Sequence, residues 1–378
     1  MSKFKDDFRA SFLRSRNMVW RKGIGGTKFW LNVLMLIFLA VVLIGARKNI
    51  VRAWHLLEDA NIWLILLLVP LQFASYYANT EIFFSYLRAR GQLRQMKSIH
   101  AMSMALEFTF VDHVFPAAGV AGASYMVWRL KHYGVPTGQA TMTQVMRFVV
   151  EFGTFMVLMV AALVWATMQD LTADWVVVGS TIAVMSLIFV LLFGNYVFGS
   201  KDRIISFSHW LSHLCSAVVR VITFGRKHSL AKASSLDAFF LDFNNDIQAL
   251  KQDRRLLRTP IAWSFLFNIL DISLFYVTFL SLGQMVNPAV LVIAYGAGNL
   301  CGNFMITPGG IGAYEAVMVT ILSTGGVDPA AALAGVILAR MLLLIGTLST
   351  GFVAYQRALN KYGKPMYYKS NPDEAKRG

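Results

Sequence analysis

The chain alternates long apolar stretches with shorter polar and mostly basic ones. A helix needs roughly 20 apolar residues to cross a bilayer, and six stretches are long enough: about 29–45, 62–80, 138–168, 175–198, 259–283 and 329–355. Two further apolar stretches, 99–130 and 287–325, are broken near their middle by proline and small residues. The arm after each break has about a dozen apolar residues, roughly 18 Å of helix or half a bilayer. The pattern predicts an all-α polytopic membrane protein with about six full transmembrane helices and two re-entrant helical hairpins.

The composition supports a membrane protein. Of the 378 residues, 56% are hydrophobic and 15% are charged, against about 25% charged in soluble domains. The net charge of +15 does not indicate nucleic acid, because the basic residues lie between apolar spans, where membrane orientation and anionic headgroups account for them. The basic N-terminal segment lacks a small-residue cleavage site, so we expect the first apolar stretch to be an uncleaved span.

The distribution of basic residues predicts the topology. If both broken stretches leave the membrane on the side they entered and the N-terminus is inside, 30 of the 35 lysines and arginines lie inside, as the positive-inside rule requires. The triplet of span, hairpin and span then occurs twice with opposite orientation, which is the inverted-repeat plan of many transporters. We expect an inner (plasma) membrane protein with both termini cytoplasmic.

This topology divides the chain into three parts. Residues 1–28 are a basic cytoplasmic segment, 29–355 are the transmembrane domain, and 356–378 are a basic, loosely ordered cytoplasmic tail. The cytoplasmic loop 199–258 has the apolar spacing of an amphipathic helix, which could lie on the inner membrane surface or pack on the protein itself.

The two breaks resemble each other. The first carries Pro116, Gly119 and Gly122, and the second carries Pro308-Gly309-Gly310-Ile311-Gly312. A lone arginine follows each proline inside the next span, Arg147 after 31 residues and Arg340 after 32. A helix breaker and a charge are both costly in lipid, so a matched pair of each predicts an internal duplication around a polar site near the midplane.

The two arginines have two possible roles. They could form structural salt bridges, Arg147 with Glu151 or Glu107 and Arg340 with Glu315 or Asp271. They could instead bind the phosphate of an anionic headgroup, since a guanidinium fork suits phosphate oxygens. Both roles combine if a resting ion pair opens to receive phosphate, and the expected site is a positively charged, hydrated pocket.

Other polar residues extend the candidate site. The glycines from Gly309 to Gly312 precede a short helix whose free N–H groups favour anions, and Glu315 in its first turn could cap the helix, pair with Arg340 or touch substrate. Glu107, Asp112 and His113 could form a proton relay or line a polar cavity, with Asp271 and Asn268 in a matching role. Their spacing fits no metal template, and we expect no metal and no cofactor.

At Thr307-Pro-Gly-Gly-Ile-Gly-Ala-Tyr-Glu315 the chain resembles the lysylphosphatidylglycerol synthase transmembrane region family. That family includes the flippase-like N-terminal domain of the bacterial multiple peptide resistance factor. The resemblance covers roughly residues 30–355 and implies movement of a lipid between leaflets, with Pro308, Gly309, Gly310, Gly312 and Glu315 at signature positions. The first break departs from it, with Ala117 and Ala118 where glycines are expected. No aminoacyl-transferase domain follows residue 355, so lysine transfer is not implied.

We therefore expect a lipid translocase that works without ATP, since no nucleotide-binding motif is present. Its partner would be an anionic phospholipid or a polyprenyl-phosphate-linked lipid in the membrane. An intramembrane enzyme that uses Glu107, Asp112 and His113 as acid and base, and an accessory subunit that binds lipid without turnover, are the alternatives.

Overall fold

The computed structural model describes residues 60–93, 98–114, 120–169, 253–304 and 312–363, together with a few isolated positions. These residues form helices and connecting turns, with no strand among them. The helices of the first half are α3 (Ile62–Ala89), α4 (Ser98–Val114), α5 (Val120–Lys131) and α6 (Thr137–Met168). The second half has the short 3₁₀ turn η1 (Arg254–Leu257), then α10 (Arg258–Ser281), α11 (Pro288–Phe304), α12 (Ala313–Thr324) and α13 (Pro329–Tyr362). The expected helical class is confirmed.

Four of the described helices, α3, α6, α10 and α13, are long and apolar enough to cross a membrane. They correspond to four of the six expected spans. The expected spans 29–45 and 175–198 and the amphipathic loop helix lie outside the described residues.

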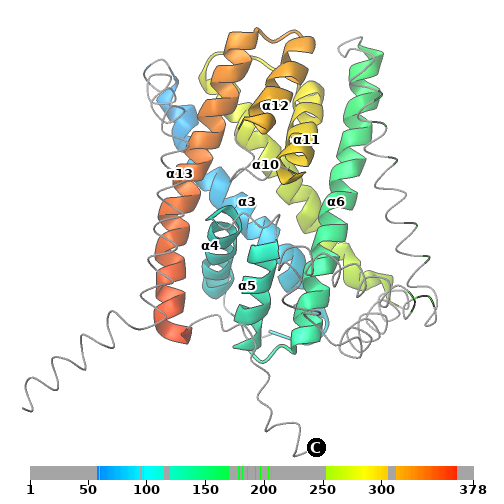
Figure 1. Cartoon of the computed structure of the whole chain (residues 1–378), viewed down its shortest axis with the longest axis vertical. Coiled ribbons are helices and arrows are strands. Elements are labelled where there is room, and N and C mark those ends of the chain that lie inside the picture. Colours follow the sequence, from blue (N-terminus) through cyan, green and yellow to red (C-terminus); the bar gives the residue numbers. More distant parts are fainter. Residues whose placement is uncertain are drawn as a thin grey trace, which may run out of the picture.

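The two halves repeat the same order of helix lengths. In each half, a long helix is followed by a helix of 17 residues, a break, a helix of 12 residues and a second long helix. The 12-residue helices match the arms of a dozen residues that the sequence predicts. Figure 1 places the pair α4 and α5 in the lower half of the molecule and the pair α11 and α12 in the upper half.

Contacts between helix ends define the two ends of the molecule. At one end, Gln92 after α3 donates to Gln139 at the start of α6, and the His132 ring after α5 makes an edge-to-face contact with Tyr362 at the end of α13. We call this the basic end, because Arg88, Lys131 and Lys361 lie in the last turns of the helices that finish there.

The opposite end joins the other helix termini. The Asn61 amide before α3 donates to the Ser281 carbonyl at the end of α10, and Asn287 before α11 donates to Gln169 after α6. Gly325 after α12 packs on Val290 near the start of α11. The ends of α11 and α12 that are away from the break between them therefore lie together at this opposite end. The ends of α4 and α5 that are away from the break between them lie together at the basic end, where Ala101 and Leu130 share one apolar cluster.

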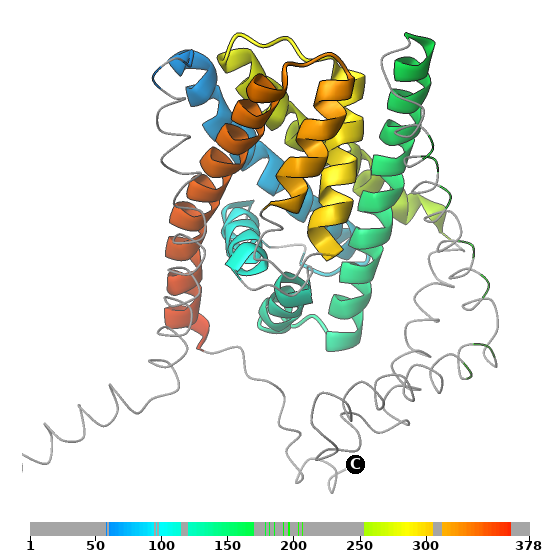
Figure 2. The ribbon, with the colours of Figure 1, turned by 45° about the horizontal axis from the view of Figure 1, so that its top comes forward.

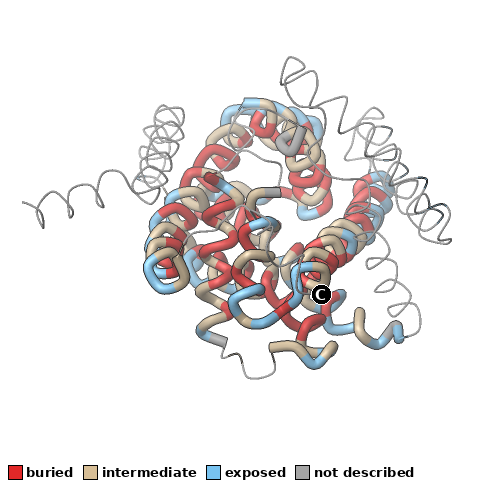
Figure 3. Tube along the Cα trace, turned by 60° about the horizontal axis from the view of Figure 1, so that its bottom comes forward, coloured by how far each residue is buried: buried red, intermediate tan, exposed pale blue. Residues whose placement is uncertain are grey.

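The helices bury apolar side chains against one another and leave apolar side chains outside as well. The largest cluster joins α6, α10, α11, α12 and α13 and contains Met159, Phe279, Ile293, Met318 and Val336. Large apolar residues such as Trp63, Val157 and Val164 are more than half exposed on the outer sides of α3 and α6, and exposed positions alternate with buried ones along the trace (Figure 3). Exposed apolar faces on long helices suit contact with lipid.

Two helices extend beyond the apolar spans that the sequence predicts. The expected span 62–80 is shorter than α3, which continues to Ala89 and buries Ile82, Phe83 and Phe84. The sequence also starts the loosely ordered tail at 356, but α13 continues to Tyr362. Both helices run past the expected membrane boundary because their backbone hydrogen bonding does not depend on lipid, and apolar packing continues beyond the first charge.

Candidate functional site

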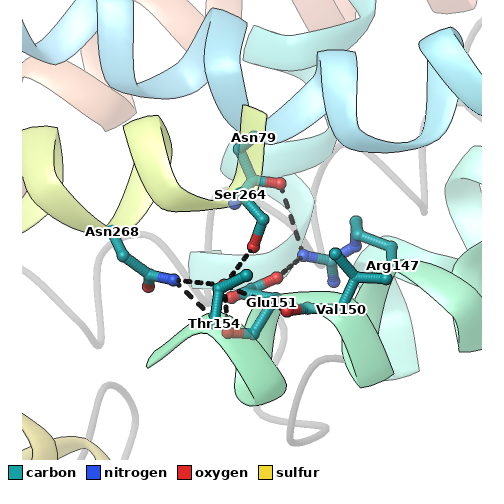
Figure 4. Close-up of polar contacts among 7 residues, drawn as sticks. All are labelled: Asn79, Arg147, Val150, Glu151, Thr154, Ser264 and Asn268. Carbon is teal, nitrogen blue, oxygen red and sulfur yellow. Dashed lines mark hydrogen bonds and ion pairs between the residues drawn. The ribbon is translucent and has the colours of Figure 1, made fainter. Parts of the chain in front are cut away.

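Arg147 lies inside α6 and forms an ion pair with Glu151 one turn further along. Its Nη1 atom is 2.5 Å from Glu151 Oε2 and 3.3 Å from Asn79 Oδ1 on α3, as Figure 4 shows. The guanidinium also stacks over the rings of Phe108 and Phe148, with centroids at 5.0 Å and 4.3 Å. The Arg147 side chain is 4% exposed and that of Glu151 is 22% exposed, so the pair is open on its carboxylate side.

Glu151 also belongs to a small polar contact between α6 and α10. Asn268 Nδ2 donates to the Glu151 carbonyl oxygen at 3.3 Å and to Thr154 Oγ1 at 3.0 Å. Thr154 and Ser264 hydroxyls are 2.6 Å apart (Figure 4). Hydrogen bonds between polar side chains hold membrane helices together where apolar association is weak, so this contact fixes α6 against α10 beside Arg147.

Arg340 occupies the matching place in the second half. Its Nη1 atom is 2.5 Å from Glu315 Oε1 on α12, with 18% and 8% of the side chains exposed, and its guanidinium lies over the Tyr314 ring at 4.3 Å. This pair is open on the arginine side. Arg147 is about 15 Å from the first residue of α6 and Arg340 about 16 Å from that of α13, at 1.5 Å per residue. Each distance is about half the 30 Å hydrocarbon core of a bilayer.

Gly312 and Glu315 together begin α12. Gly312 has a φ of 99°, a left-handed conformation that glycine adopts without strain. The Gly312 amide donates to Glu315 Oε2 at 2.6 Å. Two of the expected roles of Glu315 are therefore present at once, because it caps the helix and pairs with Arg340.

A polar stripe on α3 completes the site, and the sequence analysis missed it. Gln72, Ser75, Tyr76 and Asn79 lie at spacings of three and four residues, which puts them on one helix face. Gln72 Nε2 donates to the Leu343 carbonyl of α13 at 2.8 Å. The signal was present in the sequence, since four polar residues at helical spacing inside an apolar span are unusual.

The stripe connects α3 to three helices. Tyr76 forms a hydrogen bond with Thr347 of α13. Ser75 Oγ donates to Asp271 Oδ1 of α10 at 3.1 Å, and Asn79 accepts from Arg147 of α6. Asp271 also accepts a hydrogen bond from the Tyr295 hydroxyl of α11, so its carboxylate joins α3, α10 and α11.

Glu107 belongs to a different and closed contact. Its carboxylate binds Arg129 of α5 at 2.5 Å, with the two side chains 1% and 3% exposed, and it accepts from Tyr125 and Ser103 at 2.9 Å each. Arg129 stacks over Tyr362 at 4.1 Å. Glu107 pairs with Arg129 and not with Arg147, and Arg129 was not among the partners expected from the sequence.

Asp112 and His113, the other two candidates on α4, lie apart from Glu107. His113 is exposed and its Nδ1 atom is 2.8 Å from the Thr109 carbonyl oxygen, whereas Glu107 is buried. A Cβ at Gly122 would lie 2.8 Å from Asp112 Oδ1, so this glycine allows α5 to approach α4. Glu107, Asp112 and His113 thus do not form one acid and base group.

The structure describes only part of the two breaks. Pro116, Gly119, Pro308, Gly309 and Gly310 lie outside the described residues. Among the described residues, no group of three or more His, Cys, Asp or Glu side chains is placed to hold a metal ion.

The expected positive charge of the pocket is also wrong for the described residues. Each arginine has a carboxylate partner, and Asp271 and Asp112 lie within electrostatic range of Glu151 in addition. Carboxylates therefore outnumber guanidinium groups around Arg147 and Arg340.

The long apolar helices and their internal polar network define a multi-pass helical membrane protein. Residues 29–351 match the family model described as the lysylphosphatidylglycerol synthase TM region. The chain belongs to this family, which confirms the resemblance found in the sequence. It is also similar to a UPF0104 membrane protein of Methanothermobacter thermautotrophicus, with 21% identity over 245 residues, covering 64% of this chain and 70% of that protein.

Proposed function

We propose that the protein is a lipid translocase that moves a phosphate-bearing membrane lipid between leaflets without ATP. The family supports a role connected with membrane lipids. The observation that carries the proposal is the pair of ion pairs at Arg147 and Arg340, one in each half, about a third of the way along a long apolar helix and open on one side.

The contrast with the Glu107–Arg129 pair supports a functional reading of the two open pairs. Glu107 and Arg129 are 1% and 3% exposed and suit a purely structural role. Arg340 is 18% exposed, so a phosphate can reach its guanidinium directly. Arg147 is 4% exposed, so a phosphate reaches it when Glu151, which is 22% exposed, moves aside. A phosphate could replace the carboxylate as the arginine's partner, since both offer oxygens to the same guanidinium fork.

The helix pairs support a pathway. We infer that α4 with α5 and α11 with α12 are the two re-entrant hairpins, which enter from opposite sides and meet near the midplane in an inverted repeat. In this proposal the basic end is cytoplasmic, as the positive-inside rule requires. The headgroup would pass between the two arginines while its acyl chains stay in lipid.

Reconstitution in liposomes tests the proposal. Vesicles that contain a headgroup-labelled fluorescent phospholipid are treated with a membrane-impermeant quencher, and the slow loss of inner-leaflet signal measures translocation. We expect Arg147→Ala and Arg340→Ala to slow it roughly ten- to a hundredfold, since a charge-assisted hydrogen bond contributes about 1.5–3 kcal/mol and about 1.4 kcal/mol is tenfold. Arg357→Ala, an exposed arginine on the same helix as Arg340, is the matched control.

The outcomes separate the alternatives. Translocation that survives both substitutions at the wild-type rate would contradict the proposal. New lipid species in mass spectra, lost in Asp112→Ala, would indicate the intramembrane enzyme. No translocation and no product, with a protein that co-purifies, would indicate the accessory subunit. Mass spectrometry of lipid retained after mild detergent extraction would identify the headgroup.

A further inference from the structure

Among the described residues, the carboxylates around the proposed site outnumber the cations. Glu151 forms an ion pair with Arg147, and Glu315 forms an ion pair with Arg340. Asp271 and Asp112 are within electrostatic range of Glu151, and the described residues give neither of them an ion pair with Lys or Arg. One Asp112 oxygen, Oδ1, is buried with no hydrogen-bond partner in the described structure. Within the described part of the chain, two carboxylates in the proposed membrane interior therefore form no ion pair with Lys or Arg.

Asp271 is the more central of the two. It lies near the middle of α10, about 20 Å from the first residue at 1.5 Å per residue, and it accepts hydrogen bonds from Ser75 of α3 and Tyr295 of α11. Both donors are neutral hydroxyl groups. They can orient the carboxylate, but they supply no opposite charge.

The surroundings of Asp271 contain several titratable groups. Tyr76 of α3, Tyr295 of α11 and Tyr314 of α12 face it within electrostatic range. Glu151 of α6 and His113 of α4 do so as well. The charged groups of α6 and α13 at the site also include Arg147, paired with Glu151, and Arg340, paired with Glu315. Among the described groups within electrostatic range of Asp271, His113 could become a cation, and it is exposed and bonded to its own helix.

An ionised carboxylate without a cation in a low-dielectric interior is costly, and such groups take up a proton or a metal cation instead. Carboxylates that interact electrostatically titrate as a set and share protons. The formal charges of the described residues therefore favour a bound cation, and Asp271, with two hydroxyl donors and no ion pair to Lys or Arg among those residues, is the place for it.

We propose that Asp271 binds a proton and that this proton couples lipid translocation to a transmembrane proton gradient. The proposal rests on the proposed translocase function and names its driving ion. A proton from water on one side forms an O–H bond with an Asp271 carboxylate oxygen, and the same bond breaks when the proton is released to water on the other side.

The hydrogen bond to Tyr295 links protonation to the second helix pair. An ionised Asp271 only accepts from the Tyr295 hydroxyl of α11, whereas a protonated Asp271 can also donate to it. Proton binding therefore alters the contact between α10 and α11. Helix α11 is one arm of the helix pair whose free ends lie opposite the basic end. This contact gives the proton a direct effect on one helix of a proposed re-entrant hairpin.

The first test measures translocation in liposomes with a pH difference of one unit, imposed in either direction. One proton per cycle biases the process by up to about tenfold for each pH unit, so we expect wild-type rates to differ severalfold between the two directions. Asp271→Asn should abolish this difference. Asp328→Asn, an exposed helix cap on α13, should retain it. A sodium gradient replaces the pH gradient in a parallel arm.

The second test does not depend on lipid movement. Infrared difference spectra between wild type and Asp271→Asn should contain the carbonyl band of a protonated carboxylic acid, shifted by deuterium oxide. If the difference spectrum lacks this band, the assignment of the proton to Asp271 is overturned. The assignment is also overturned if the Asp271→Asn protein still has the band and the Asp112→Asn protein lacks it. Wild-type rates that ignore the pH difference, or that follow the sodium gradient, overturn the coupling. Wild-type protein that moves no lipid refutes the translocase itself, while the band still reports on Asp271.

Discussion

Gly351 of α13 lets α13 approach α4, and adding one methyl group there should destabilise the protein. A Cβ at this position would lie 2.5 Å from Phe110 Cβ and 2.9 Å from the Leu106 carbonyl oxygen. Carbon atoms in contact are separated by about 3.5–4.0 Å. The obstructing atoms are a Cβ and a backbone oxygen, which cannot rotate away, so the two helices must separate.

The magnitude follows from two opposing effects. Overpacking a close contact costs about 1–3 kcal/mol, and this site, where backbone must shift, belongs at the upper value. Alanine recovers up to about 1 kcal/mol through its better helix propensity. We therefore expect Gly351→Ala to lower the free energy of unfolding by roughly 2 kcal/mol.

Gly153 on α6 is the matched control, because no atom lies within 4 Å of the Cβ that alanine would add there. Gly153→Ala should leave the stability unchanged or raise it by up to about 1 kcal/mol. Unfolding by SDS titration in mixed micelles measures both variants. Equal stability of the two variants would show that α4 does not approach α13 as closely as described.

Two further predictions concern the closed ion pair and the topology. Arg129→Met should cost roughly 3–5 kcal/mol of unfolding free energy, because it leaves the Glu107 carboxylate buried without its cation, and the double variant Glu107→Leu/Arg129→Met should recover most of the loss. SDS titration measures this cycle, and a double variant no better than the single one would contradict the explanation. In a background where Cys215 and Cys301 are replaced by serine, Met285→Cys, at a residue 90% exposed after α10, should react with an impermeant maleimide from outside the cell. Asn360→Cys near the end of α13 should react only after permeabilisation, and the reverse pattern would invert the proposed orientation.

Local patterns in the sequence predicted much of the fold. The arms of a dozen residues after each break, the start of the helix after Gly312 and the four described spans follow from apolar length and from glycine and proline, which act on their own neighbourhood. The pairing of Arg147 with Glu151 was within reach, because residues four apart share a helix face. Arg340 with Glu315 was one of two partners named.

The sequence did not predict the partner of Glu107. Arg129 follows an apolar arm and precedes a turn, and at such a position an arginine serves equally well as a topology signal or as a buried counter-ion. Which of these two roles Arg129 has depends on Tyr362, which is 233 positions further on and covers the Arg129 guanidinium. A contact between helices so distant in the chain leaves no mark in local spacing.

The stripe on α3 changes how the site is understood. The sequence analysis centred the site on the two arginines, yet the structure connects Asn79 to Arg147 and Ser75 to Asp271 through one helix face. A displacement of α3 would therefore alter the partner of a guanidinium and the partner of a carboxylate together. In the proposed mechanism, phosphate binding at Arg147 would free Glu151 from its cation, which would add a carboxylate without an ion pair within electrostatic range of Asp271 and favour proton uptake. Coupling between lipid and proton then follows from charge balance within one polar network, without any signal passing through the rest of the protein.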